Sequence, residues 1–298
     1  MIKIAGMQLK NPVLSASGTF GFGEELVPFT DVNRLGGICL KGLTLQPRQG
    51  NPPTRIAETA SGILNSVGLQ NPGIDVFVSE ILPRIRRFDT NLIANIAGST
   101  VEEYVELCKR LDTTDIDGIE LNLSCPNVKH GCLAFGSDPA MVELVTKSAR
   151  AVTKKPLFVK LTPNVTDITL PAKAAEAGGA DAISLINTLL GMAIDLKTRK
   201  PLLANVTGGL SGPAVKPVAL RMTYDVARAV KVPVIGMGGI STYEDAAAFL
   251  LAGATAVQVG TATLANPNAC CEIIDGLAAY AAAQGLSCPS QLTGQLIV

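Results

Sequence analysis

The residues best suited to chemistry lie between Glu120 and Gly136, in the sequence ELNLSCPNVKHGCLAFG. Asn122 and Ser124 alternate with leucines, so they share one face of a predicted strand that runs to Cys125. A thiolate can accept a proton, and the amides on either side can hold a neutral polar ring through paired donor and acceptor contacts. The pattern indicates a proton-transfer site. A buried cysteine beside a turn is the alternative for this cysteine taken alone.

Two other reactive side chains follow in the same stretch. His130 is the only histidine of the chain, and histidine is the usual first candidate for a general base. It lies in a loop with Pro, Gly and Lys, whereas Cys125 is attached directly to a strand. We therefore assign the base to Cys125 and interpret His130 as a surface-loop residue. Cys132 is either a second thiol near the site or a small loop residue.

Eight apolar runs of strand length supply the elements that must position these groups. They are residues 12–15, 37–43, 91–97, 118–125, 156–161, 182–187, 232–237 and 256–260. Amphipathic or alanine-rich segments of helical length separate most of them, which indicates parallel strands joined by crossover helices. No G-x-G-x-x-G follows the first run, which counts against a doubly wound dinucleotide-binding sheet.

The predicted fold is therefore a single-domain (β/α)₈ TIM barrel over residues 1–298, in the α/β class. Two long inserts, 46–72 and 189–212, are predicted to be functional loops at the C-terminal face of the barrel. The sequence predicts where three helices begin. Thr100 with Glu103 and Ser241 with Glu244 have the spacing of capping boxes, and Asp138 precedes a proline at the first helical position.

Composition excludes several classes of partner. The 25 basic and 25 acidic residues cancel, so the broad positive field expected of a nucleic-acid or anionic-membrane binder is missing. No apolar run reaches about 18 residues, and the start MIKIAGMQLKN lacks the pattern of a signal peptide. The seven cysteines include no C-x-x-C pair, so we expect no metal or iron–sulfur site in this chain. A cytoplasmic protein is predicted.

Polar residues gather at the ends of the apolar runs, where a barrel places its chemistry. Lys41 and Lys160 close two otherwise apolar runs, and Asn95, Asn122 and Asn187 lie at equivalent places. The lysines suit an anionic ligand or a ring that gains negative charge. A lysine whose ammonium reaches solvent from a strand end is the alternative for either one alone.

Glycines at the last two strands add a phosphate-binding signal. Gly238-Gly239 precedes a predicted helix and Gly260-Thr261 follows the final run. Barrels often bind phosphate with these loops, because glycine lets backbone N–H groups approach the anion. Together with the lysines they suit a phosphorylated cofactor with a polar ring, and flavin mononucleotide (FMN) is the best match.

The motifs resemble those of a known family. NLSCPNVKHG, LKGLTLQPRQGNPPTR, ILNSVGLQNPG, VKLTPNVTDI, INTLLG, GGLSGPA, IGMGGI and VQVGTA are similar to the motif set of dihydroorotate dehydrogenases, flavoproteins of pyrimidine synthesis, over nearly the whole chain. The resemblance implies a (β/α)₈ barrel that binds FMN and oxidises dihydroorotate to orotate. The cysteine form of SCPN looks like the cytosolic class 1B, whose catalytic subunits are linked to NAD. Quinone-linked members instead have serine at the Cys125 position and a membrane-binding extension.

The resemblance also implies partners and roles. The partner would be a subunit that carries FAD and an iron–sulfur cluster, joined to a homodimer of barrels in a heterotetramer. Cys125 would take the C5 proton while a hydride passes from C6 to the flavin N5, and Lys160 would stabilise the reduced flavin anion. The implied substrate-binding residues are Lys41, Asn65, Ser66, Val67, Gly68, Leu69, Asn122, Asn127, Asn187 and Thr188. The implied FMN-binding residues are Ser17, Lys41, Gly42, Asn95, Asn122, Lys160, Ile186, Gly212, Gly238, Gly239, Gly260 and Thr261.

Several alternatives stay open at this level. A fumarate-linked single-subunit (class 1A) dihydroorotate dehydrogenase shares much of the motif set. A dihydrouridine synthase would also be a flavin barrel with a catalytic cysteine, but its tRNA substrate favours a basic face. A phosphosugar isomerase or aldolase would need no flavin, and a non-enzymatic binding barrel would not turn over any dihydropyrimidine. The segment GCLAFG departs from the family pattern at Cys132 and Leu133.

Overall fold

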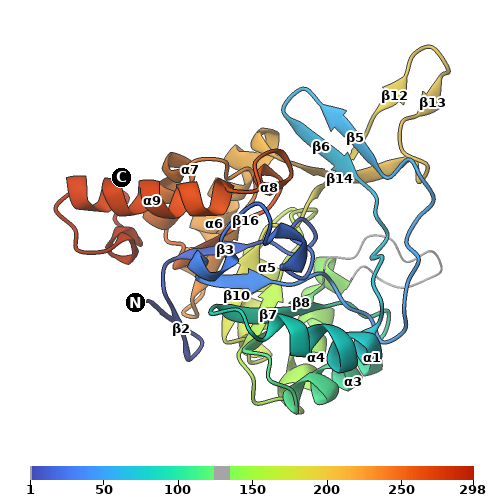
Figure 1. Cartoon of the computed structure of the whole chain (residues 1–298), viewed down its shortest axis with the longest axis horizontal. Coiled ribbons are helices and arrows are strands. Elements are labelled where there is room, and N and C mark those ends of the chain that lie inside the picture. Colours follow the sequence, from blue (N-terminus) through green and yellow to red (C-terminus); the bar gives the residue numbers. More distant parts are fainter. Residues whose placement is uncertain (1, 124–134) are drawn as a thin grey trace.

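The computed structural model describes residues 2–123 and 135–298, and its centre is a closed barrel of eight parallel strands (Figure 1). The ring order is β3-β4-β7-β8-β9-β10-β15-β16, closed between β16 and β3. The strands are β3 (Val13–Ser15), β4 (Gly37–Cys39), β7 (Asn91–Ile96), β8 (Gly118–Asn122), β9 (Leu157–Lys160), β10 (Ala182–Leu185), β15 (Val234–Met237) and β16 (Ala256–Val259). Each coincides with one predicted apolar run, so the predicted TIM barrel is confirmed.

Helices follow most of the barrel strands and cover the outside of the barrel. They are α1 (Ile74–Val76), α2 (Leu82–Ile85), α3 (Val101–Asp112), α4 (Pro139–Arg150), α5 (Thr169–Ala177), α6 (Lys216–Ala229), α7 (Tyr243–Leu251), α8 (Ala262–Ala265) and α9 (Ala269–Ala283). A π-helical turn, η3 (Phe77–Ile81), joins α1 to α2. The 3₁₀ turns are η1 (Glu24–Leu26), η2 (Val32–Arg34), η4 (Phe135–Ser137), η5 (Pro213–Val215) and η6 (Pro289–Leu292).

The helix starts confirm the prediction at Asp138, confirm only the N-cap at Thr100, and correct the prediction at Ser241. Asp138 caps α4 ahead of Pro139. Thr100 caps α3 by accepting from the backbone N–H of Glu103, but the predicted box is incomplete, because the Glu103 carboxylate accepts from the N–H of Ser99 and not from that of Thr100. The prediction that Ser241 and Glu244 cap α7 is wrong by one residue. Thr242 accepts from the N–H of Asp245, whose carboxylate accepts from the N–H of Thr242. Ser241 and Thr242 are both good cap residues, and the Asp245 carboxylate accepts from the N–H of each, but only the Thr242 hydroxyl accepts from the first turn of the helix.

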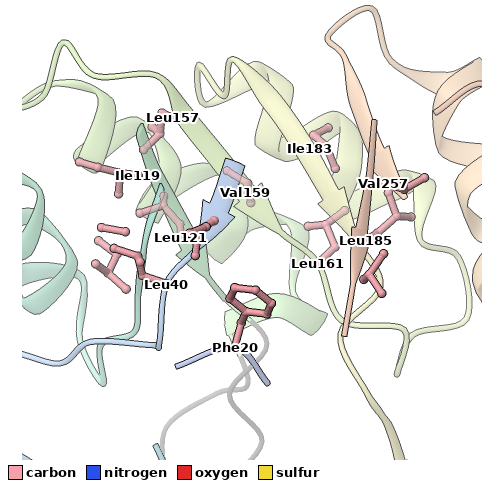
Figure 2. Close-up of a cluster of buried hydrophobic side chains, with 14 of the residues drawn as sticks. Phe20, Leu40, Ile119, Leu121, Leu157, Val159, Leu161, Ile183, Leu185 and Val257 are labelled. Atoms are coloured by element: carbon pink, nitrogen blue, oxygen red, sulfur yellow. The ribbon is translucent and has the colours of Figure 1, made fainter. Parts of the chain in front are cut away.

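Side chains alternate between the two faces of the barrel wall, as the period of a strand requires. Outward-facing side chains pack under the helices to form the larger core (Figure 2). Those on β8, β9, β10 and β16 include Ile119, Leu121, Leu157, Val159, Ile183, Leu185 and Val257. Inward-facing residues fill the barrel, and their character changes from apolar to polar towards the C-terminal ends of the strands.

An N-terminal hairpin closes the opposite end of the barrel. Strands β1 (Ile2–Ile4) and β2 (Met7–Leu9) pair antiparallel, and their apolar side chains join a second core inside the barrel. The barrel residues of this core are Leu14, Cys39, Ile93, Phe158, Ala182, Ile235 and Ala256. The bottom of the barrel is therefore a packed apolar plug, and the polar end is left for a ligand.

The two long inserts form a sheet, which the sequence analysis did not predict. Strands β5 (Ile56–Thr59) and β6 (Gly62–Asn65) of the first insert pair with β11 (Leu189–Met192) and β14 (Thr207–Ser211) of the second, in the order β11-β14-β6-β5. A hairpin of β12 (Ile194–Asp195) and β13 (Lys200–Pro201) extends from it, at the upper right of Figure 1. The inserts thus support each other above the barrel mouth. None of the helices in the described ranges is long and apolar enough to cross a membrane.

Candidate active site

A cavity of about 550 Å³ opens at the C-terminal ends of the barrel strands, between the barrel mouth and the insert sheet. This volume lies within the roughly 300 to 1,000 Å³ that is usual for cofactor and small-molecule sites. Its lining includes every described residue that the sequence analysis assigned to a site: Ser17, Lys41, Gly42, Asn65, Ser66, Val67, Gly68, Leu69, Asn95, Asn122, Lys160, Ile186, Asn187, Thr188, Gly212, Gly238, Gly239, Gly260 and Thr261. The structure therefore brings these dispersed residues together, and their individual roles stay predictions.

The predicted base lies outside the described residues. Cys125 and Asn127 belong to the undescribed segment 124–134, as do His130 and Cys132. Asn122, the last residue of β8, precedes that segment by two positions and lines the cavity. The hydroxyl of Tyr104 donates to the carbonyl of Asn122 at 2.7 Å, which holds the end of this strand in place.

Amide side chains from three separate elements surround one part of the cavity. Asn187, which follows β10, donates from Nδ2 to Oδ1 of Asn122 at 3.2 Å. Asn65 at the end of β6 donates to the carbonyl of Gly209 on β14 at 3.2 Å. The backbone N–H of Thr188 donates to Asn187 Oδ1 at 2.7 Å. These contacts fix the amide orientations, so the group can offer donors and acceptors in set directions to a small polar ring.

Basic groups border the same cavity. Burial and the nearby charge of Arg55 hold the pKa of Lys41 below its usual value. Arg48 also lines the cavity and donates to the hydroxyl of Ser99 at 3.1 Å. Arg55 donates to the carbonyls of Asn51 and Gln49. Arg48 as a lining residue and Arg55 as a charged neighbour of Lys41 were not predicted, although the insert motif LQPRQGNPPTR carries both. Together they favour an anionic ligand.

The floor of the cavity is a polar network centred on Glu120, which is fully buried. Its Oε1 accepts from Cys39 Sγ at 3.1 Å and from Asn95 Nδ2 at 2.7 Å. Its Oε2 accepts from Ser184 Oγ at 2.7 Å and Gln258 Nε2 at 2.9 Å. Lys160 Nζ lies 4.0 Å from Oε1. These side chains come from six of the eight barrel strands, and they form the first polar layer above the apolar plug.

Two pKa shifts follow from this network. Burial raises the pKa of Glu120, but the charge of Lys160 and the hydrogen bonds from its neighbours outweigh it, so that pKa lies below its usual value. Burial and the Glu120 charge hold the pKa of Cys39 well above its usual value, which keeps this thiol a neutral donor. Glu120 and Gln258 were not among the predicted site residues. Polar residues at inward positions of apolar strands were the available signal.

Glycines form a cradle at the ends of the last two barrel strands. Gly212, Gly238 and Gly239 have φ angles of 100°, 123° and 75°. A Cβ on Gly239 would lie 2.9 Å from the carbonyl oxygen of Gly212 and 2.8 Å from the backbone nitrogen of Lys216. The hydroxyl of Thr261 donates to that of Ser211 at 2.8 Å across the same region. Close backbone of this kind suits a phosphate group.

The donors and acceptors of the cavity can be compared with the needs of a flavin nucleotide. Asn95 Oδ1 and Gln258 Oε1 are buried at its floor without a hydrogen-bond partner among the described residues. A polar ring with N–H groups and carbonyl oxygens would match these acceptors and the Lys160 ammonium. The glycine cradle would accommodate its phosphate. The residues present therefore fit a flavin mononucleotide. Within residues 2–123 and 135–298, no group of three or more His, Cys, Asp or Glu side chains could hold a metal ion.

Comparison with known proteins gives consistent matches. A sequence model of the dihydroorotate dehydrogenase family matches residues 1–280. The chain is 62% identical over 279 residues to "Dihydroorotate dehydrogenase B (NAD(+)), catalytic subunit" of Alkaliphilus oremlandii (strain OhILAs), a match that covers 94% of this chain and 92% of the relative. Proteins of the same name from Alkaliphilus metalliredigens (strain QYMF) and Thermoanaerobacter pseudethanolicus (strain ATCC 33223 / 39E) are 58% and 54% identical. These two matches cover 99% and 100% of this chain and 98% of each relative.

Proposed function

The chain belongs to the dihydroorotate dehydrogenase family, and we propose that it is the FMN-containing catalytic subunit of an NAD-linked complex. It oxidises dihydroorotate to orotate in pyrimidine biosynthesis, with a flavin as cofactor and NAD as the acceptor of the complex. The observation that carries the proposal is the single cavity lined by every described residue of the predicted site. We further propose that residues 1–298 form one FMN-binding domain.

FMN would be held by the floor of the barrel and the glycine cradle. Its phosphate would lie against Gly238, Gly239, Gly260 and Thr261, and its ring would meet the lysines and amides of the floor. When bound, FMN supplies the acceptor for the hydride that leaves C6 of the substrate. The positive charge of Lys160 at the cavity floor would stabilise a reduced, anionic ring. The buried unpaired oxygens of the floor and the positive φ angles of the cradle support this assignment.

The substrate would lie on the side of the amides. Asn65, Asn122 and Asn187 with Thr188 would hold its carboxylate and ring polar groups, and Asn127 would complete this set. Cys125 would accept the proton that leaves C5. The positive charges of Lys41, Arg48 and Arg55 near the cavity support an anionic substrate.

The name "catalytic subunit" of the relatives supports a partner subunit. We propose that this partner carries FAD and an iron–sulfur cluster and that two barrels and two partners form a heterotetramer in the cytoplasm. A direct test of cofactor identity is mass spectrometry of the flavin released from the purified chain. We expect one FMN per chain, and reduction of an artificial dye on addition of dihydroorotate. Release of FAD or riboflavin in place of FMN would contradict the proposal.

Replacing Gly239 with alanine should weaken the binding of FMN. The new Cβ would collide with the backbone at Gly212 and Lys216, so the cradle must open, and we expect about a tenfold or greater loss of FMN affinity. Gly285→Ala is a matched control. Gly285 has a φ of 74°, against 75° for Gly239, but its Cβ would meet nothing within 4 Å. Fluorescence titration of each apoprotein with FMN measures the difference, and equal affinities would exclude the cradle.

Replacing Lys160 with alanine should lower the reduction potential of the flavin and weaken its retention. The ammonium stabilises the anionic reduced ring more than the neutral oxidised ring, so the reduced form becomes relatively less stable when the ammonium is removed. A potentiometric titration with a reference dye measures the midpoint. An unchanged or higher midpoint, with FMN fully bound, would refute the role of Lys160.

A further inference from the structure

The carboxylate of Glu120 has more partners than any other side chain at the cavity floor. It accepts hydrogen bonds from Cys39, Asn95, Ser184 and Gln258, at distances between 2.7 and 3.1 Å. These donors come from β4, β7, β10 and β16, while Glu120 itself is on β8 and Lys160 is on β9. A buried charge of this kind is costly unless it is paired and hydrogen-bonded. No other fully buried carboxylate occurs among the described residues.

An ionised carboxylate can only accept hydrogen bonds, and this fixes the orientation of two amides. Asn95 and Gln258 must each turn their NH₂ group towards Glu120. Their carbonyl oxygens are then directed away from it, and these are two of the buried oxygens without a described partner. Asn95 Oδ1 lies close to Gly42, a cavity-lining residue, since a Cβ there would be 3.0 Å from it. Glu120 thereby decides that the floor offers acceptors rather than donors at these two places.

The same carboxylate holds the charge of Lys160. The ammonium is 4.0 Å from Glu120 Oε1, and its side chain is only 6% exposed. Asn122 pairs with Lys160 across β8 and β9, and Ser184 pairs with it across β9 and β10. The lysine is thus confined between neighbours that direct it to the floor of the cavity. A negative charge beside it also moderates the positive potential that a ligand at the floor would experience.

We propose that Glu120 is a positioning residue for the flavin: it orients the Asn95 and Gln258 amides to receive the ring, holds the Lys160 ammonium at the cavity floor, and lowers the flavin reduction potential through its own negative charge. The inference rests on the proposed function, because it requires FMN in this cavity. It assigns to Glu120 no contact with the substrate or with the reacting atoms.

The decisive variant is Glu120→Gln, which keeps the size of the side chain and removes the charge. A glutamine must present an NH₂ group to at least one of the surrounding donors, so the amide orientations are no longer fixed and the affinity for oxidised FMN should fall about tenfold or more. Loss of the negative charge should favour the anionic reduced flavin. We expect the ratio of affinities for reduced over oxidised FMN to rise about tenfold, which is about 30 mV of higher midpoint for a two-electron couple.

Asp117→Asn is the matched control. Asp117 directly precedes β8, at the end of the strand remote from the cavity, where its carboxylate accepts from Arg86 at 2.6 Å and from the backbone N–H of Leu92 at 2.7 Å. Its loss should lower the stability of the barrel without moving the flavin midpoint. A residue with a merely structural role would behave like Asp117, whereas Glu120 should shift the midpoint in the direction opposite to Lys160→Ala.

Potentiometric titration of the FMN-loaded proteins and FMN titration of the apoproteins give both readouts. An unchanged midpoint and FMN affinity in Glu120→Gln would overturn this inference while the proposed function stood. A wild-type chain that bound no FMN would overturn the proposed function and this inference with it. If Glu120→Gln does not fold, Glu120→Asp decides. Its shorter carboxylate keeps the charge but cannot reach all its donors, so weaker FMN binding supports the inference and unchanged binding overturns it.

Discussion

Replacing Cys125 with alanine will abolish reduction of the bound flavin by dihydroorotate while FMN and orotate still bind. The variant removes the predicted base. It leaves in place the glycine cradle and the side chains of Asn65, Asn122 and Asn187 that line the cavity. General base catalysis is typically worth about 10²- to 10⁴-fold in rate. Stopped-flow absorbance under anaerobic conditions measures the reduction rate, and orotate titration of the same protein serves as the control for an intact site.

Cys125→Ser gives the matching pH test. A hydroxyl is much harder to deprotonate than a thiol, whose usual pKa is about 8.5, so residual activity should rise towards higher pH than in the wild type. The reduction rate should therefore increase across a pH range where the wild-type rate has already levelled off. Flavin bleaching in the alanine variant at close to the wild-type rate would reject Cys125 as the base, whatever the serine variant does.

The second large effect concerns the electron acceptor. The isolated chain should reduce artificial dyes with dihydroorotate but reduce NAD at a negligible rate, and addition of the partner subunit should restore NAD reduction. This follows from the proposal that a partner with FAD and an iron–sulfur cluster relays the electrons, which the names of the relatives support. Steady-state assays with dye, fumarate and NAD, each with and without the partner, measure it.

Each outcome of these assays has a distinct meaning. Dye reduction by the chain alone is the control that the catalytic site is loaded and active. Efficient fumarate reduction by the chain alone would place it with the single-subunit class. NAD reduction without the partner would contradict the relay.

Much of the barrel could be predicted because its signals are local. Each strand was a short apolar run bounded by turns, and the N-caps at Thr100 and Asp138 depend on residues within four positions of each other. The cavity lining was predictable for a related reason. In a barrel, the polar residues that close each apolar run must meet at one end, so Lys41, Lys160 and Asn187 could be placed together without knowing any contact between them.

The network beneath the cavity could not be predicted in this way. The alternation of side chains directs Glu120 and Gln258 into the barrel, but their pairing joins residues 138 positions apart and depends on how the barrel closes. The strand pairing of the inserts is equally non-local, since β6 meets β14 across the barrel mouth. Proline, glycine and asparagine in these inserts indicated loops, and the tertiary context overrode that preference.

The central claim is that this cavity holds FMN and that dihydroorotate reduces it. Visible absorption spectra of the purified protein, recorded before and after addition of dihydroorotate without oxygen, test this most directly. We predict flavin bands that bleach on addition of dihydroorotate in the wild type and persist in Cys125→Ala. A colourless protein, or flavin bands that dihydroorotate leaves unchanged in the wild type, would contradict the account.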